Sequence, residues 1–112
     1  MPYGTENLFS ATAAGTDSGA TATQAAVANK NHVVTGIYGH ADADALIRVT
    51  DGGTVIFESK VDVSVEGFSF AFPGINLLCA TNSAAAGVIS ASSADCQVNI
   101  SGYTIPYPED LK

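Results

Sequence analysis

Charged residues are scarce in this sequence, and tryptophan is absent. Only 13% of the 112 residues are charged, with four Lys and Arg against eleven Asp and Glu, for a formal net charge of -7. A charged share about half the usual ~25% excludes a disordered polyelectrolyte. The four basic residues stand far apart, at Lys30, Arg48, Lys60 and Lys112. Because nucleic-acid binding requires clustered cations that neutralise phosphates, we expect no nucleic-acid partner.

Long apolar runs and an export signal are also missing. No segment approaches the roughly 18 consecutive apolar residues of a membrane-spanning helix. The first residues have neither the cationic region nor the apolar region of a signal peptide. We therefore expect a soluble protein that is made in the cytoplasm and has no membrane partner.

Cysteine occurs only at Cys79 and Cys96. Without an export signal, two reduced and buried thiols are favoured over a disulfide, because cytosolic thiols are kept reduced and free cysteine packs like a small apolar residue. Neither cysteine lies in a CxxC motif or next to a cation that would lower its pKa. Neither is therefore predicted to be catalytic.

The composition changes near residue 29. Residues 10–28 are almost wholly Ala, Thr, Ser and Gly, with few side chains large enough to fill a core. This composition predicts an arm over residues 1–28, either extended or forming an edge strand. The alanine content of residues 23–28 leaves a short helix as an alternative, although the surrounding Gly and Thr oppose a longer one.

After the arm, β-branched and aromatic residues are interrupted every eight to twelve positions by turn signals, a pattern typical of all-β domains. We predict a β-sandwich domain over residues 29–104 and a proline-containing tail over residues 105–112. The fold class is all-β, a two-sheet antiparallel β-sandwich. A jelly-roll strand order is favoured over an immunoglobulin-like one.

Residues 46–59 form two alternating runs around a turn at residues 51–53, which predicts a β-hairpin. A two-residue loop would place Arg48 opposite Phe57. A three-residue loop instead places Ile47 opposite Phe57 and gathers the apolar side chains on one face. Because a shift of one residue turns every side chain to the other face, the three-residue loop is preferred.

The alternation of apolar and polar residues predicts further short strands. They are expected over residues 32–40, 61–66, 68–72, 75–80, 86–91 and 96–101. Gly36 and Gly39 interrupt the first of them and suggest a bulge or close backbone packing. Phe68, Phe70 and Phe72 share one face and are predicted to supply much of the core.

One cluster has the side chains of a metal site. His40, Asp42 and Asp44 would share one face of an extended backbone, where carboxylate and imidazole groups are possible ligands of a divalent cation. The cluster lacks the glycine-centred turn and closing Glu of a calcium loop, so a solvated loop is favoured. Asp62 and Glu66 lie on the solvent-exposed face of a predicted strand and are not expected to form a catalytic carboxylate pair.

No nucleophile with a base and an acid is recognisable, and His32 has no acidic neighbour to orient it. We therefore predict no enzymatic activity and no cofactor. An exposed aromatic side chain such as Tyr38 or Tyr107 could stack on a sugar ring. A carbohydrate-binding or receptor-binding β-module is therefore one functional hypothesis.

Several large apolar side chains lie outside the predicted core, in the terminal segments. In a monomer they would be stranded in solvent, so they suggest an oligomer with exchanged arms. These candidate contact residues are Tyr3, Leu8, Phe9, Tyr107 and Leu111.

Four short patterns suggest a family. They are Asn31-x-Val33-Val34-Thr35-Gly36-Ile37, Val49-x-Asp51-Gly52 with Ile56-Phe57, Phe68-Ser69-Phe70-x-Phe72-Pro73, and Val98-Asn99-Ile100-x-Gly102-Tyr103. In these patterns the chain resembles the small jelly-roll decoration (cement) proteins of tailed bacteriophage capsids. The resemblance implies a non-enzymatic homotrimer, made in the host cytoplasm, that binds the major capsid protein on the outer surface of the virion. It supplies no catalytic residues, and it makes the five candidate contact residues of the terminal segments possible contacts to the capsid or to a neighbouring protomer. The alternative function is a carbohydrate-binding or receptor-binding β-module, either free-standing or part of a phage fibre or surface protein.

Overall fold

The computed structural model describes residues 8–15, 19–61, 67–73, 76–90 and 95–106, and these contain eight strands and no helix. The strands are β1 (Leu8–Gly15), β2 (Ala20–Gln24), β3 (Lys30–Ala41), β4 (Ala45–Asp51), β5 (Thr54–Val61), β6 (Phe68–Ala71), β7 (Ala85–Ser90) and β8 (Cys96–Pro106). The all-β prediction is confirmed. Since the described residues form no helix at all, none of them forms one that could cross a membrane.

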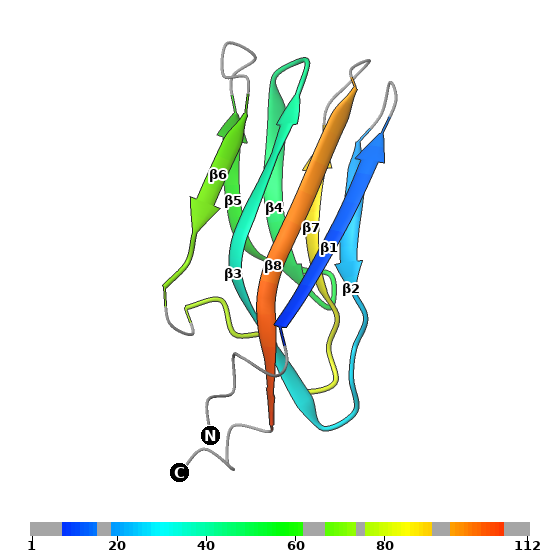
Figure 1. Ribbon diagram of the computed structural model, residues 1–112, viewed down its shortest axis with the longest axis vertical. Coiled ribbons are helices and arrows are strands. Elements are labelled where there is room, and N and C mark those ends of the chain that lie inside the picture. Colours follow the sequence, from blue (N-terminus) through cyan, green and yellow to red (C-terminus); the bar gives the residue numbers. More distant parts are fainter. Residues whose placement is uncertain (1–7, 16–18, 62–66, 74–75, 91–94, 107–112) are drawn as a thin grey trace.

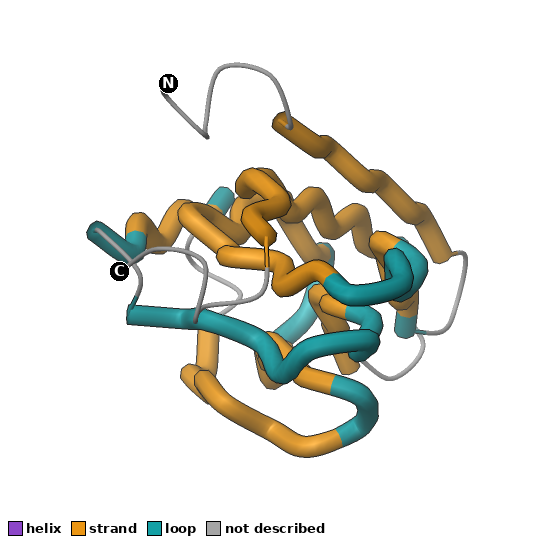
Figure 2. Tube along the Cα trace, turned by 90° about the horizontal axis from the view of Figure 1, so that it is seen from below, coloured by secondary structure: helices purple, strands orange, loops and turns teal. Residues whose placement is uncertain are grey.

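The strands form two antiparallel four-stranded sheets packed face to face (Figures 1 and 2). The first sheet has the order β1-β8-β3-β6, and the second has the order β2-β7-β4-β5. The hydrogen-bonded pairs are therefore nested along the chain: β1 with β8, β2 with β7, β3 with β6 and β4 with β5. This nesting is the strand order of a jelly roll, the topology favoured from the sequence.

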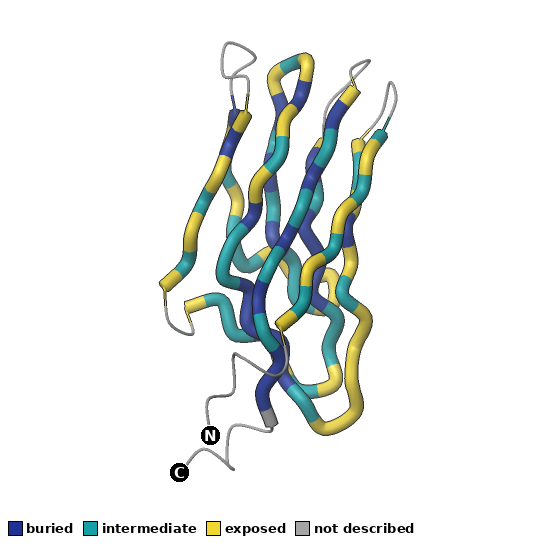
Figure 3. The backbone as a smooth tube through the Cα atoms, in the orientation of Figure 1, coloured by how far each residue is buried: buried dark blue, intermediate teal, exposed yellow. Residues whose placement is uncertain are grey.

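The core lies between the central strands of the two sheets, which carry most of the dark buried positions in Figure 3. Alternating strand residues point inward, and the most deeply buried of these side chains are Ile37, Ile47, Val49, Ile89, Val98 and Ile100. Gly87 of β7 faces the same core. A Cβ at this position would lie 2.3 Å from Cγ2 of Ile100, so glycine leaves the space that the isoleucine fills.

Aromatic rings fill the side of the core between β5 and β6. Phe68 is buried, and Phe70 and Phe72 are half-buried against the core, so their predicted shared face is confirmed. Phe57 of β5 joins them, with ring centroids 5.2 Å from Phe70 and 4.7 Å from Phe72. The aromatic cluster thus connects the second sheet to the first.

The register of the β4–β5 hairpin differs from both sequence alternatives. The turn has two residues, Gly52 and Gly53, both with positive φ (58° and 96°), and the predicted three-residue loop is wrong. A bulge at Ile56 then shifts the register and places Phe57 opposite Val49. Ile56 and Phe57 both pack against the core, which requires the extra residue. The bulge also brings Arg48 opposite Glu58 on the outer face.

Close backbone packing in β3 follows the prediction. The register with β8 shifts between Val34 and Gly36, as expected for a bulge. At Gly39 a Cβ would lie 2.0 Å from the carbonyl oxygen of Gln97, so only glycine allows β8 to approach so closely.

Two other predicted strands have different outcomes. Most of the strand expected over residues 61–66 lies outside the described residues, and only Val61 is seen, at the end of β5. The strand expected over residues 75–80 is wrong. Its described part forms a single bridge between Leu78 and Val33, because β6 has already paired with the other half of that edge of β3.

The predicted arm contains β1 and β2, which are the outermost strands of the first and second sheets. The short helix considered for residues 23–28 is wrong. Ala22 points into the core while β2 pairs with β7, and this packing outweighs the helix propensity of alanine. At the other terminus, β8 continues into the predicted tail as far as Pro106.

Candidate functional site

The possible metal ligands lie around the β3–β4 connection. His40, Asp42 and Asp44 are all exposed. The Asp42 backbone N–H donates to the carbonyl oxygen of Asp95 at 3.0 Å and so connects this loop to the start of β8. No three His, Cys, Asp or Glu side chains in the described part of the chain are grouped to hold a metal ion.

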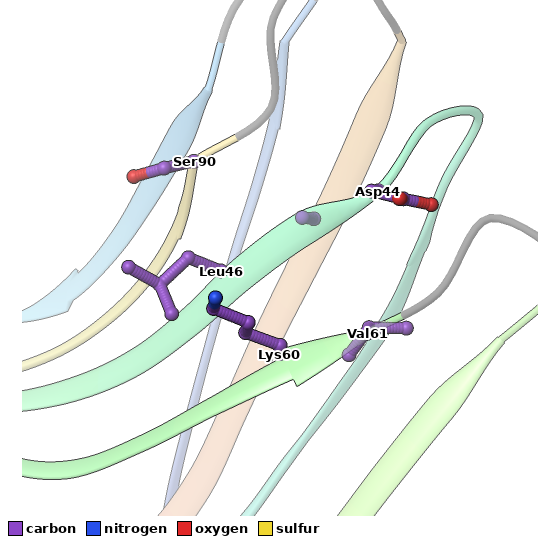
Figure 4. A pocket seen from close by; sticks show the side chains of 6 residues that line it. Asp44, Leu46, Lys60, Val61 and Ser90 are labelled. Carbon is purple, nitrogen blue, oxygen red and sulfur yellow. The ribbon is translucent and has the colours of Figure 1, made fainter.

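An open pocket of about 510 Å³ lies where β4, β5 and β7 meet near this loop. It is lined by Asp44, Ala45, Leu46, Lys60, Val61 and Ser90. In Figure 4 the carboxylate of Asp44 points away from the ammonium group of Lys60. The two groups are therefore not arranged as an acid–base pair for proton transfer to a shared ligand.

The outer surface of the first sheet differs from the rest of this acidic chain. Apart from Leu8 at the start of β1, its outward positions in β1, β8, β3 and β6 are small or polar and include no Asp, Glu, Lys or Arg. They are Ser10, Thr12, Ala14, Gly36, Tyr38, His40, Ser69, Ala71, Gln97, Asn99 and Ser101. We call these residues the uncharged face. Such a surface can be covered by another protein without removing a charged side chain from water.

Tyr38 is the largest side chain of the uncharged face, and 42% of its surface is exposed. It lies between Asn99 of β8 and Ser69 of β6 in the strand register. The Asn99 side chain donates to the Tyr38 carbonyl oxygen at 3.3 Å. An exposed ring flanked by an amide and a hydroxyl group can stack on a sugar and bond its hydroxyl groups.

The predicted contact residues have different positions. Leu8 is 70% exposed at the start of β1. Phe9 differs from the expectation that it is stranded in solvent, because its ring packs edge-on against His32 with centroids 5.2 Å apart. Gly102 leaves room for this ring. Tyr3, Tyr107 and Leu111 lie outside the described residues.

Both terminal segments join the sandwich at the same end. Leu8 pairs with Tyr103 near the end of β8, and Pro106 pairs with Lys30 at the start of β3. The described chain therefore begins, at Leu8, and ends, at Pro106, at the same end of the sandwich. The exposed Leu8 side chain is at this end too.

A buried polar network holds this end together. His32 is 1% exposed, and its Nε2 lies 2.7 Å from the carbonyl oxygen of Ala25. A carbonyl oxygen can only accept, so Nε2 donates to Ala25, and Nδ1 and the Thr104 hydroxyl group are hydrogen-bonded at 2.8 Å. His32 is thus a structural residue that connects the β2–β3 loop to β8.

Asn31 and Asp51 fix the β6–β7 connection at the same end. The Asn31 side chain donates to the Cys79 carbonyl oxygen at 2.8 Å, and the carboxylate of Asp51 accepts from the Ala80 N–H at 2.9 Å. Ser83 donates to the same carboxylate. Sequence reasoning missed this network because its partners lie 29 to 48 positions apart and follow no motif.

Cys79 and Cys96 are both free and buried, as predicted. Cys79 lies beside His32 and Cys96 beside Ala41, about 30 Å apart along β3 at roughly 3.3 Å per residue. Burial raises the pKa of the Cys79 thiol to about 12, with the charge of Asp51 as a second cause. Burial also raises the pKa of Cys96, against a hydrogen bond from the Gly15 backbone that lowers it.

The chain was compared with protein-family models, curated proteins and solved structures. No family model matches it, and neither a curated protein nor a solved structure does.

Proposed function

We propose that this chain is a non-enzymatic structural protein that decorates and stabilises the outer surface of a tailed-phage capsid as a homotrimer. Its partners would be the major capsid protein and two further copies of itself. The observation that carries the proposal is the nested jelly-roll strand order. Viral capsid domains use this architecture repeatedly.

The distribution of exposed apolar surface supports the proposal. Leu8 is exposed where both terminal segments are attached, which gives that end an apolar anchor for a shell. A trimer would present three such anchors at once. Linked contacts of modest strength bind far more tightly than any one of them alone. The net charge of -7 would keep the free protein soluble before assembly.

Co-sedimentation with undecorated shells, assembled from the major capsid protein encoded in the same genome, tests this function. We expect the full chain to pellet with shells and Leu8→Ser to bind about tenfold more weakly, since burying a leucine contributes roughly 1.5 kcal/mol or more. Val55→Ser is the matched control, because Val55 is also an exposed aliphatic residue on a strand. Wild-type protein that stays in the supernatant with saturating shells would refute the proposal.

A carbohydrate-binding module is the second candidate, and the exposure of Tyr38 between Asn99 and Ser69 favours it. Jelly rolls also occur in lectins. A glycan array separates the two functions. Binding that Tyr38→Ala abolishes would support the lectin function, whereas an array without signal would exclude it for the glycans displayed.

A further inference from the structure

The exposed strand edges on the two sides of the sandwich differ in length, charge and regularity. On one side, β6 has only four residues and is followed by Pro73, and β5 exposes Glu58 and Lys60 and contains the bulge. Short strands, charges, prolines and bulges are the devices that keep sheet edges from pairing with other chains. That side is therefore protected against strand addition.

On the other side, formed by β1 and β2, the β1 edge has none of these devices. β1 is eight residues long, and its register with β8 runs without a bulge from Leu8 to Gly15. β2 pairs as regularly with β7. Neither strand contains a proline or a charged residue, and the backbone of β1 has no strand beyond it in the described parts of the chain. This side therefore offers unpaired backbone donors and acceptors to an added strand.

We propose that the β1 edge pairs with the β1 edge of a second copy of this chain. Two copies related by a two-fold axis beside Ala11 would pair antiparallel, so that the first sheets of both copies form one continuous sheet. Ser10 of each copy then lies opposite Thr12 of the other on the outer face, and Phe9 lies opposite Ala13 on the inner face. The contact is self-complementary because inward residues meet inward residues.

Charge opposes a second copy less at this edge than at the charged parts of the surface. Each chain has a net charge of -7, so two copies repel each other over most of their surfaces. The edge strands themselves are uncharged, and no like charges would lie opposite each other in this register. The half-buried Phe9, Ala11 and Ala13 side chains, which already pack on the core, would become fully covered.

This pairing goes beyond the proposed function, because a two-fold contact closes at two copies and differs from a three-fold one. It predicts even-numbered assemblies: a dimer, or a dimer of trimers if the chain also trimerises. Capsid binding can fail without affecting this prediction, and the prediction can fail without affecting capsid binding.

Native mass spectrometry of the full chain, with two matched double variants, tests the pairing. We expect Ser10→Lys/Thr12→Lys to halve the mass of the wild-type assembly and to raise its dissociation constant at least about 100-fold, since opposed like charges cost several kcal/mol. The control is Ser69→Lys/Ala71→Lys, which changes the net charge by the same amount. Ser69 and Ala71 lie on β6 at the opposite edge of the same sheet, in register with Thr12 and Ser10 across the two strands between them. We expect the control to keep the wild-type mass.

Disulfide trapping provides a second test that does not depend on the lysine variants folding. Facing residues at the two-fold axis have Cα atoms about 4.5–5.5 Å apart, within the range of a disulfide. Ala11→Cys should therefore give a covalent dimer on mild oxidation, and Ala71→Cys at the opposite edge should not. An odd-numbered wild-type assembly, an edge variant of unchanged mass, or no covalent dimer from Ala11→Cys would overturn the proposal.

Discussion

The His32 ring and the Thr104 hydroxyl group are hydrogen-bonded at 2.8 Å, although 72 positions separate them in the sequence. The bond joins the start of β3 to the end of β8. The other ring nitrogen holds the β2–β3 loop through Ala25. These bonds stabilise the end of the sandwich at which the first strand begins, at Leu8, and the last strand ends, at Pro106.

His32→Leu should lower the free energy of unfolding by about 2–4 kcal/mol, because the Thr104 hydroxyl and the Ala25 carbonyl lose their buried partner. Urea denaturation at neutral pH measures the loss. His40→Leu, on the same strand but exposed, should change stability by no more than about 0.5 kcal/mol. Equal effects of the two variants would show that the His32 bonds contribute nothing.

Gly87→Ala should destabilise the protein by about 1–3 kcal/mol, since the added methyl group would overlap the Ile100 side chain in a packed core. Thermal unfolding followed by circular dichroism reports the change. Ser90→Ala, an exposed site on the same strand, serves as the control. A Gly87→Ala protein as stable as the control would mean that the two sheets are less closely packed at β7.

The rings of Phe57 and Phe72 should be energetically coupled because they pack edge-on with centroids 4.7 Å apart. A double-mutant cycle of Phe57→Leu and Phe72→Leu should give a coupling energy of about 0.5–1.5 kcal/mol. Strictly additive losses would contradict the aromatic cluster that connects the two sheets.

Stability should fall as the pH rises above 9. The Cys79 thiol has a pKa near 9.0 when unperturbed and about 12 in the fold, so between these values the unfolded chain loses a proton that the folded chain keeps. Ionisation therefore favours the unfolded state. Urea titrations across this range should show a shallower decline for Cys79→Ala than for the wild type. The raised pKa of Cys96 leaves a smaller decline in the variant. Identical profiles would refute this effect of Cys79.

Strand positions were predictable to the extent that alternation of side chains marks each buried face. Alternation does not encode strand order, so the sequence favoured a jelly roll without distinguishing it from other sandwich topologies, and the strand pairing decides between them. The hairpin register was not predictable, because it depends on Ile56 and Phe57 both reaching the core, which only the bulge permits. The path of residues 76–84 was unpredictable for a similar reason. It is fixed by side chains distant in the sequence, such as Asn31 and Asp51.

The candidate surfaces were predictable only in part. Leu8 and Tyr38 are exposed, and the roles considered for them stay predictions. The partial burial of Phe9 follows from the small size of Gly102, which the sequence pattern does not reveal. The uncharged face requires the strand order, since its residues come from four strands that are distant in the chain.

Electron cryo-microscopy of undecorated capsid shells incubated with this protein tests the proposed function most directly. The account predicts added density for trimers of the eight-stranded sandwich on the outer surface, at three-fold or quasi-three-fold positions of the shell. Bare shells in the presence of saturating, folded protein would contradict it.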